Sequence, residues 1–156
     1  MDSPAERLIA ADVVRGVSRM LYRHDYFGVA EVPLGNARRA DIMALGPKGE
    51  VIIVEVKISR ADLLGDGKWP DYLDYCDRYF WAVPQGFDLD LFERESLAPK
   101  TTGLIVADRY DAAILREPDP RPLAAARRKA ETLRLARMAA RRMMVLSSVL
   151  EIEIEG

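Results

Sequence analysis

The sequence predicts a single α/β domain in which a helix is followed by a three-stranded meander, a second helix and further strands, forming a mixed sheet flanked by helices. Apolar residues recur at helical spacing near the N-terminus, and short β-branched and aromatic segments separated by glycine-containing turns follow. At 156 residues the chain has the length of one domain and can bury a core without disulfides.

The first helix is predicted from a capping box at Ser3 and Glu6, with Pro4 in its first turn. It should extend to about residue 24, because one apolar stripe continues that far. This stripe consists of Val13, Val17 and Met20, with Val14 and Leu21 alongside.

Three strands should follow, at about residues 28–34, 40–45 and 50–58. Glycine-containing turns at residues 35–36 and 46–49 separate them, so consecutive strands should pair as antiparallel neighbours. The third strand opens with an unbroken β-branched run, which is typical of a strand buried on both faces.

The remaining elements are predicted from caps, propensities and breakers. They are a capped turn at 59–62, a short helix at about 70–77, an ambiguous segment at 87–96, strands at 79–83, 103–107 and 112–115, and a long helix after Pro122. The closing residues 151–155 alternate glutamate and isoleucine, which is the pattern of a strand.

The most informative segment for function is residues 53–57, which place two charged side chains in an otherwise apolar strand. Side chains alternate across a strand, so Glu55 and Lys57 point to the same face. A hairpin with the preceding strand brings Asp41 towards Glu55. Buried charges are costly unless a partner or a metal compensates them. By this pattern alone, a surface pair of Glu55 and Lys57 at a strand end is an equally good interpretation.

The element order and these residues together resemble the PD-(D/E)XK nuclease superfamily, and more closely the MmcB-like DNA repair proteins. The resemblance covers roughly the first two-thirds of the chain. It rests on Arg39-Ala40-Asp41-Ile42, Glu55-Val56-Lys57, Lys68-Trp69-Pro70-Asp71-Tyr72 and Tyr75-Cys76-Asp77-Arg78. Ala40 stands where the superfamily name has proline, a residue that does no chemistry.

The resemblance implies a restriction-endonuclease-like αβββαβ core and a metal-dependent DNA endonuclease that hydrolyses phosphodiester bonds in DNA repair. Asp41, Glu55 and the main-chain carbonyl of Val56 would hold Mg²⁺ or Mn²⁺. Lys57 would orient or activate the attacking water, or stabilise negative charge on the phosphoryl group. The expected partner is damaged or branched DNA, and a symmetric junction as substrate would favour a homodimer.

Two other functions fit the same residues. One is a non-catalytic DNA-binding module that retains the nuclease fold, and the other is an RNA-directed nuclease. Substrate structure is set by surface loops and oligomeric arrangement in such folds, so the strands that carry Asp41 and Glu55 do not distinguish these alternatives.

The sequence divides into a nuclease-like domain at residues 1–120 and a basic C-terminal helix and tail at 121–156, which we expect to pack on the same domain. Residues 121–142 carry a net charge of +7, so the rest of the chain sums to −9. A basic segment on an acidic protein is suited to nucleic-acid phosphates, because each bound phosphate releases a counterion.

Within this helix Arg127, Arg134 and Arg141 recur every seven residues and therefore form one stripe. We predict that this stripe binds DNA, with a merely solvated helix face as the alternative. The opposite face carries small residues and is expected to pack on the sheet or on a partner helix. It consists of Thr132, Ala136, Ala140 and Met143.

Other residue types exclude several classes of site. With Cys76 and His24 as the sole cysteine and histidine, neither an internal disulfide nor a Cys/His zinc cluster can form. The absence of a signal-peptide core or a long apolar run predicts a cytoplasmic protein without membrane contact. Trp69, Tyr72 and Tyr75 lie near the predicted site and could stack on bases, although aromatics at this spacing are more typical of a core.

Overall fold

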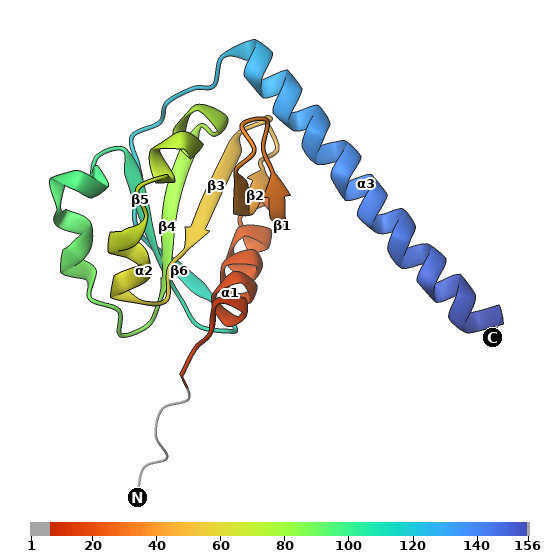
Figure 1. Ribbon diagram of the computed structural model, residues 1–156, viewed down its shortest axis with the longest axis horizontal. Helices are drawn as coiled ribbons and strands as arrows, with labels where there is room; N and C mark the ends of the chain where they lie inside the picture. The colour runs from red at the N-terminus through yellow and green to blue at the C-terminus, as the bar shows by residue number, and fades with distance from the viewer. Residues whose placement is uncertain (1–6, 156) are drawn as a thin grey trace, which may run out of the picture.

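The structure is a computed structural model that describes residues 7–155, with the side chains of residues 7–148. Its elements, in chain order, are α1 (Ala10–Arg23), β1 (Phe27–Pro33), β2 (Arg39–Leu45), β3 (Val51–Val56), α2 (Arg60–Gly65), η1 (Trp69–Tyr75), β4 (Arg78–Pro84), η2 (Leu89–Glu93), η3 (Glu95–Leu97), β5 (Thr102–Ala107), β6 (Ala112–Arg116) and α3 (Ala125–Glu155), where η marks a 3₁₀ helix (Figure 1).

The six strands form one mixed sheet in the order β1-β2-β3-β4-β5-β6. The first three strands pair antiparallel, as the predicted meander requires, whereas β4 lies parallel to both β3 and β5. The β3–β4 crossover is made by the short helices α2 and η1, and β6 closes the sheet antiparallel to β5. The predicted α/β class and the mixed sheet flanked by helices are therefore confirmed.

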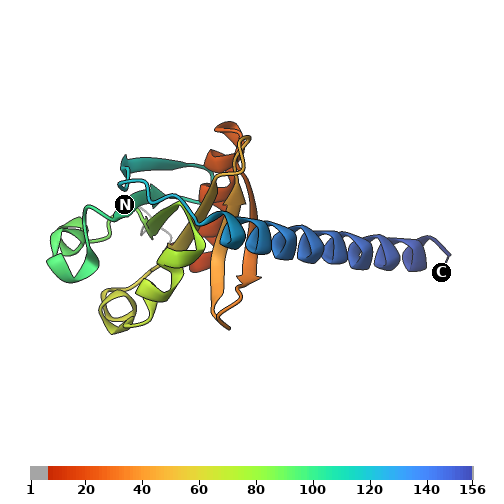
Figure 2. The same ribbon diagram turned by 90° about the horizontal axis from the view of Figure 1, so that it is seen from above.

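Each face of the sheet has its own apolar core. Helix α1 covers one face, where Val13 and Val17 pack with Ile42, Val54 and other strand residues. The 3₁₀ helices and α2 cover the other face, which contains most of the aromatic side chains. These layers, seen from above in Figure 2, leave β3 buried along its whole length. Any charged side chain on β3 must therefore sit at the end of the strand or find a partner.

Helix α1 begins later than the capping pattern predicts. The proposed cap at Ser3 lies outside the described residues, and residues 7–9 are not helical. Asp12 instead accepts a hydrogen bond from the N–H of Ile9 at 3.0 Å, so a carboxylate in the first turn satisfies a free helical donor. The helix ends at Arg23, close to the predicted residue 24.

Helix α3 packs through a different face from the one we predicted. Within residues 125–148, Glu131 and Leu135 are the buried side chains, whereas Ala136, Ala140 and Met143 are exposed and Thr132 is half-buried. The reason lies outside the helix. Two hydrogen bonds of 2.6 and 2.7 Å attach its first turns to Asp77, just before β4, and this attachment decides which face meets the domain.

The donor of these two bonds is Arg128, which also donates to the carbonyl of Gly49 at 2.7 Å.

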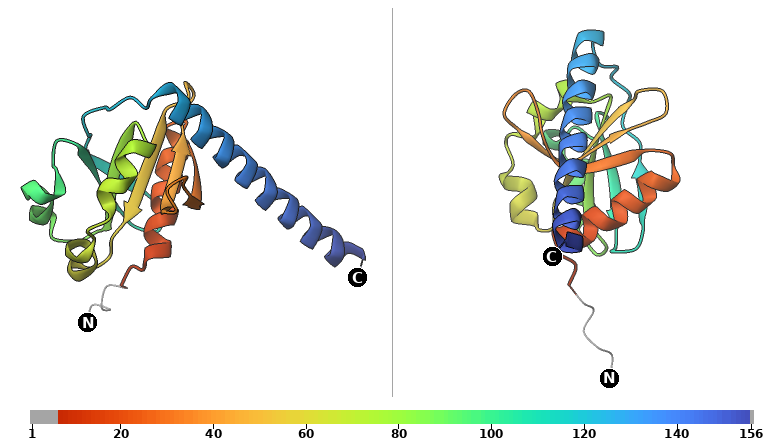
Figure 3. Two further views of the ribbon diagram at one scale, coloured as in Figure 1. Left: turned by 45° about the horizontal axis from the view of Figure 1, so that its top comes forward. Right: turned by 90° about the vertical axis from the view of Figure 1, so that its right-hand side faces the viewer.

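Residues 151–155 continue α3, so the strand predicted there is wrong. No glycine or proline occurs between Leu123 and Glu155, so nothing in the chain stops the helix. Helix α3 contacts β1 and η1, and its remainder projects away from the domain (Figures 1 and 3). The described contacts between α3 and the domain thus involve the first part of this helix.

Candidate functional site

Asp41 and Glu55 occupy opposing positions on β2 and β3. The antiparallel register pairs Ile42 with Val54, which places Asp41 opposite Glu55 at the next step. The N–H of Asp41 donates to Oε1 of Glu55 at 3.1 Å, and the N–H of Val56 donates to Oδ2 of Asp41 at 2.8 Å. The structure thus brings the two carboxyl groups together where β2 begins and β3 ends.

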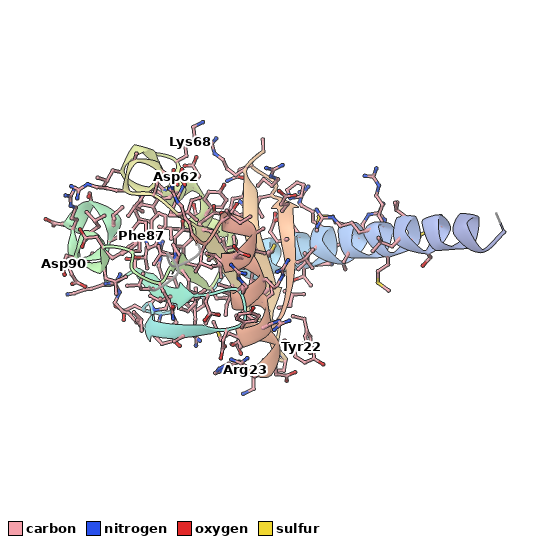
Figure 4. The ribbon with its side chains drawn as sticks, turned by 90° about the horizontal axis from the view of Figure 1, so that it is seen from below. Tyr22, Arg23, Asp62, Lys68, Phe87 and Asp90 are labelled. Carbon is pink, nitrogen blue, oxygen red and sulfur yellow. The ribbon has the colours of Figure 1, made fainter. Side chains whose placement is uncertain are left out.

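The pair lies in an open pocket of about 1050 Å³ between the ends of these strands and the α2–η1 segment. Arg38, Arg39 and Lys68 add positive charge to its lining, and Asp62 and Asp66 add negative charge. The pocket therefore offers both acidic oxygens and basic groups to one bound molecule. Figure 4 shows two of its residues, Asp62 and Lys68, on the opposite side of the domain from Tyr22 and Arg23.

Glu55 is only 5% exposed, and its protonation is strongly perturbed. Burial, the negative charge of Asp41 and a side-chain hydrogen bond with Asp41 together raise the pKa of Glu55 from 4.5 to about 9. Two carboxyl groups that share a hydrogen bond in a desolvated site cannot both be ionised without a compensating cation. At neutral pH the pair therefore keeps a proton, which a metal ion could replace.

Lys57 is buried and points towards the acidic residues of the α2–η1 segment. Its Nζ lies 2.9 Å from Oδ2 of Asp66 and 3.9 Å from Oδ1 of Asp62. Burial alone would lower the pKa of Lys57, but the hydrogen bond and charges of Asp66 and Asp62 outweigh it and leave that pKa raised. Lys57 is therefore a charged lysine, held beside the carboxyl pair by two aspartates.

The aromatic residues near the site divide by position. Trp69 and Tyr75 belong to the core, with Trp69 packed edge-on against Trp81. Tyr72 also packs in the core, but its hydroxyl reaches the pocket and donates to the carbonyl of Arg39 at 3.0 Å. Burial and the charges of the nearby acids raise the pKa of Tyr72 to about 12, so it remains a hydrogen-bond donor there.

The predicted arginine stripe lies on α3, and none of its three members lines this pocket. The guanidinium carbon of Arg127 lies 4.2 Å from the centre of the Tyr75 ring. Arg134 approaches Glu131, with 3.5 Å between Nε and Oε2. Arg141 is exposed. Two of the three side chains thus have contacts near the domain surface, and one faces water.

Comparison with known families matches residues 4–149 to the family described as DNA repair protein MmcB-like. The chain belongs to this MmcB-like family. A solved structure of a protein of unknown function from Silicibacter pomeroyi is similar at 43% sequence identity, with a TM-score of 0.79, and the match covers 91% of this chain and 94% of that one. A comparison with curated proteins found no match. No helix within residues 7–155 is long and apolar enough to cross a membrane.

The donor set of the MmcB-like pocket suits a hard divalent cation. Asp41 and Glu55 provide carboxylate oxygens, and the N–H and C=O of Val56 share the strand edge that faces Asp41. Within the described residues no cluster of three or more acidic, histidine or cysteine ligands occurs. Magnesium binds in such sites through one or two carboxylates and completes its shell with water and substrate phosphate. The residues present fit that mode.

Asp66 is one of the pocket residues that the sequence did not predict as part of the site. It lies between Gly65 and Gly67, in a segment between the predicted capped turn at 59–62 and the short helix at about 70–77. An acidic residue held between two glycines directly after a capped helix is a usable signal, because the glycines let the backbone bring the carboxylate close to another group. What sequence could not reveal is that its partner is Lys57.

The raised pKa of Glu55 predicts a pH-dependent stability. Between pH 4.5 and about 9 the carboxyl group of Glu55 is protonated in the folded protein and ionised in the unfolded chain. Its contribution to the free energy of unfolding is therefore fully present below pH 4.5 and is lost as the pH rises through about 9. The free energy of unfolding should fall by up to about 1.4 kcal/mol per pH unit in this interval. Glu55→Gln, which is neutral at every pH, should lack this loss.

Thermal unfolding in chelator from pH 5 to 9 measures this effect. The difference in Tm between Glu55→Gln and wild type should grow in favour of the variant as the pH rises. Glu31→Gln, which changes an exposed glutamate on β1, should follow wild type throughout. Equal pH profiles for wild type and Glu55→Gln would contradict the assignment.

Proposed function

We propose that this MmcB-like protein is a metal-dependent endonuclease of the PD-(D/E)XK type, acting on damaged or branched DNA. The observation that carries the proposal is the apposition of Asp41 and Glu55 in an open pocket, with Lys57 two residues beyond Glu55. Membership in a family of DNA repair proteins supports DNA as the substrate. The basic residues of the pocket lining support a phosphate-bearing ligand.

Each residue has a distinct role in this proposal. Asp41 and Glu55, with the Val56 carbonyl, would hold Mg²⁺ or Mn²⁺ in the pocket. The bound ion would supply a water of lowered pKa and a positive charge beside the phosphate oxygens. Lys57 places a positive charge where negative charge develops on the phosphoryl group. Arg39 and Lys68 hold the neighbouring backbone phosphates in the pocket.

The alternative, a non-catalytic DNA-binding module, is favoured by one observation. Nζ of Lys57 is already paired with Asp66 at 2.9 Å, and this contact competes with a phosphoryl oxygen. In such a module the carboxyl pair would serve metal-assisted binding or only the stability of the strand ends.

Incubation with a panel of nucleic acids in Mg²⁺ or Mn²⁺ tests the proposal. The panel should contain linear, nicked, flapped and four-way-junction DNA, together with an RNA of the same sequence. We expect cleavage of one or more branched or nicked DNAs and none in chelator. Tight binding without cleavage in either metal would favour the non-catalytic module, and preferential cleavage of RNA would favour an RNA-directed nuclease.

The metal ligands can be tested without activity. Divalent ions should raise the Tm of the wild type because they bind the folded state, and more so at pH 8.5 than at pH 6 because binding displaces the proton of Glu55. Asp41→Asn should abolish the shift. Asp62→Asn removes a charge from the same pocket without removing a proposed ligand, so it should retain the shift. If both variants respond like wild type, the ligand assignment is wrong.

The arginine stripe makes a separate prediction about DNA affinity. Replacing Arg127, Arg134 and Arg141 with glutamine should weaken binding to all sequences about equally. It should also flatten the dependence of log K on log salt by up to about one unit per lost phosphate contact. Fluorescence anisotropy over a salt series measures both effects.

A matched control removes the same charge from exposed arginines elsewhere on the domain. The control replaces Arg15, Arg19 and Arg94 with glutamine. Its salt slope should remain that of wild type. If the stripe variant also binds like wild type at every salt concentration, the stripe is only a solvated face of α3.

A further inference from the structure

Four consecutive residues of α3, 143–146, are apolar and exposed. Met143, Met144, Val145 and Leu146 are 68%, 71%, 56% and 64% exposed. Consecutive residues of a helix point about 100° apart, so these four side chains are directed all round the helix axis. A helix that is apolar all round is normally enclosed by other protein, and no single face of this chain's own domain could enclose it.

Among the side chains of α3 that the structure describes, Arg142 is the last to hydrogen-bond with the domain. Arg142 donates to the carbonyl of Glu31 at 2.6 Å and also to that of Ala30. Residues 143–155 then continue for about 20 Å beyond this anchor, as the projecting helix in Figures 1 and 2 shows. An unsupported helix of this length is marginal in water, and a contiguous exposed apolar patch marks an interaction site.

The charge distribution along α3 points to the occupant. Residues 127–142 contain seven lysines and arginines and one glutamate, whereas residues 149–155 contain three glutamates and no basic residue. Two copies of such a helix attract one another when they run antiparallel, because the acidic end of each lies beside the basic part of the other. In a parallel pair, like charges would lie together.

We infer that α3 associates with α3 of a second copy of this chain, as an antiparallel pair centred near Met144. In this register residues 151–155 of one copy lie beside residues 133–137 of the other, where Arg134 and Arg137 occur. Those of the four exposed apolar side chains that face the partner helix meet their counterparts at the centre, away from water. The partner helix covers one face of residues 143–146, and the partner's domain covers the remaining faces.

The oligomeric state of the full chain tests the inference. Light scattering after size exclusion, and sedimentation over a concentration series, should show a dimer for the wild type. Met144→Glu should weaken the dimer about a hundredfold or more, because it forces two charges into an apolar contact. Leu115→Glu changes another exposed leucine, on β6, and should remain a dimer. Circular dichroism should show that both variants keep the wild-type fold.

Single cysteines test the orientation. Cys76 is 2% exposed and should not react in the folded protein. Met144→Cys should form an intermolecular disulfide in high yield, whereas Leu133→Cys should not, because an antiparallel pair separates the two copies of residue 133 by about 33 Å along the axis. Equal crosslinking of both variants would indicate a parallel pair and overturn the inference.

A wild type that is monomeric at every concentration, or a Met144→Glu variant that dimerises like wild type, would also overturn it. Dimerisation that appears only when DNA is added would assign this face to a nucleic-acid complex and count against the inference. None of these outcomes depends on cleavage, so the dimer and the nuclease proposal stand or fall separately.

Discussion

Glu55→Gln should reduce metal-dependent cleavage at least about a thousandfold, because it removes a charged ligand from the proposed ion and with it the electrostatic stabilisation of the reacting phosphate. The amide can still accept the hydrogen bond from the N–H of Asp41, so the strand ends should keep their geometry. Initial rates on the best substrate of the DNA panel, with protein in excess over DNA, measure the effect.

Two comparisons separate chemistry from folding in this experiment. Glu31→Gln alters an exposed glutamate of β1 and should cleave like wild type. The Tm of Glu55→Gln should equal or exceed that of wild type above neutral pH, so a loss of activity there cannot come from unfolding. Wild-type rates in Glu55→Gln would remove this residue from the catalytic site.

Lys57→Ala should slow cleavage about a hundredfold or more and leave DNA affinity nearly unchanged. The reason is that Lys57 is proposed to act on charge that develops only in the transition state, whereas the exposed basic groups hold the DNA in its ground state. Single-turnover rates and anisotropy measure the two quantities. Lys68→Ala is the matched control, since it removes another lysine of the pocket and should lower affinity more than rate.

The ion pair between Lys57 and Asp66 allows a structural role of Lys57 to be distinguished from a catalytic one. Lys57→Ala and Asp66→Asn both break this pair. If Lys57 only stabilises the pocket, the two variants should lose activity and Tm to the same extent. If Lys57 acts on the phosphoryl group, Asp66→Asn should retain much more activity than Lys57→Ala. Equal losses would therefore assign Lys57 a structural role in the pocket and remove it from the proposed chemistry.

Local patterns of the sequence were sufficient to predict the order of the strands and helices as far as the start of α3, and the pairing of Asp41 with Glu55. Strand periodicity and glycine-containing turns specify a hairpin whose register follows from the apolar residues that must face the core. Any chain that forms this hairpin places these two carboxyl groups opposite one another. The helix start near Ser3 was less predictable, because a carboxylate at Asp12 can cap the chain as well.

Only the tertiary structure decided what surrounds those residues. The pKa of Glu55 depends on burial by layers that are distant in sequence, and the partner of Lys57 comes from a crossover segment whose path glycines leave open. The packed face of α3 depends on the attachment of Arg128 to Asp77, a contact across 51 residues. Periodicity along a helix defines which residues share a face, but long-range contacts determine which face meets the core and which remains available to a partner.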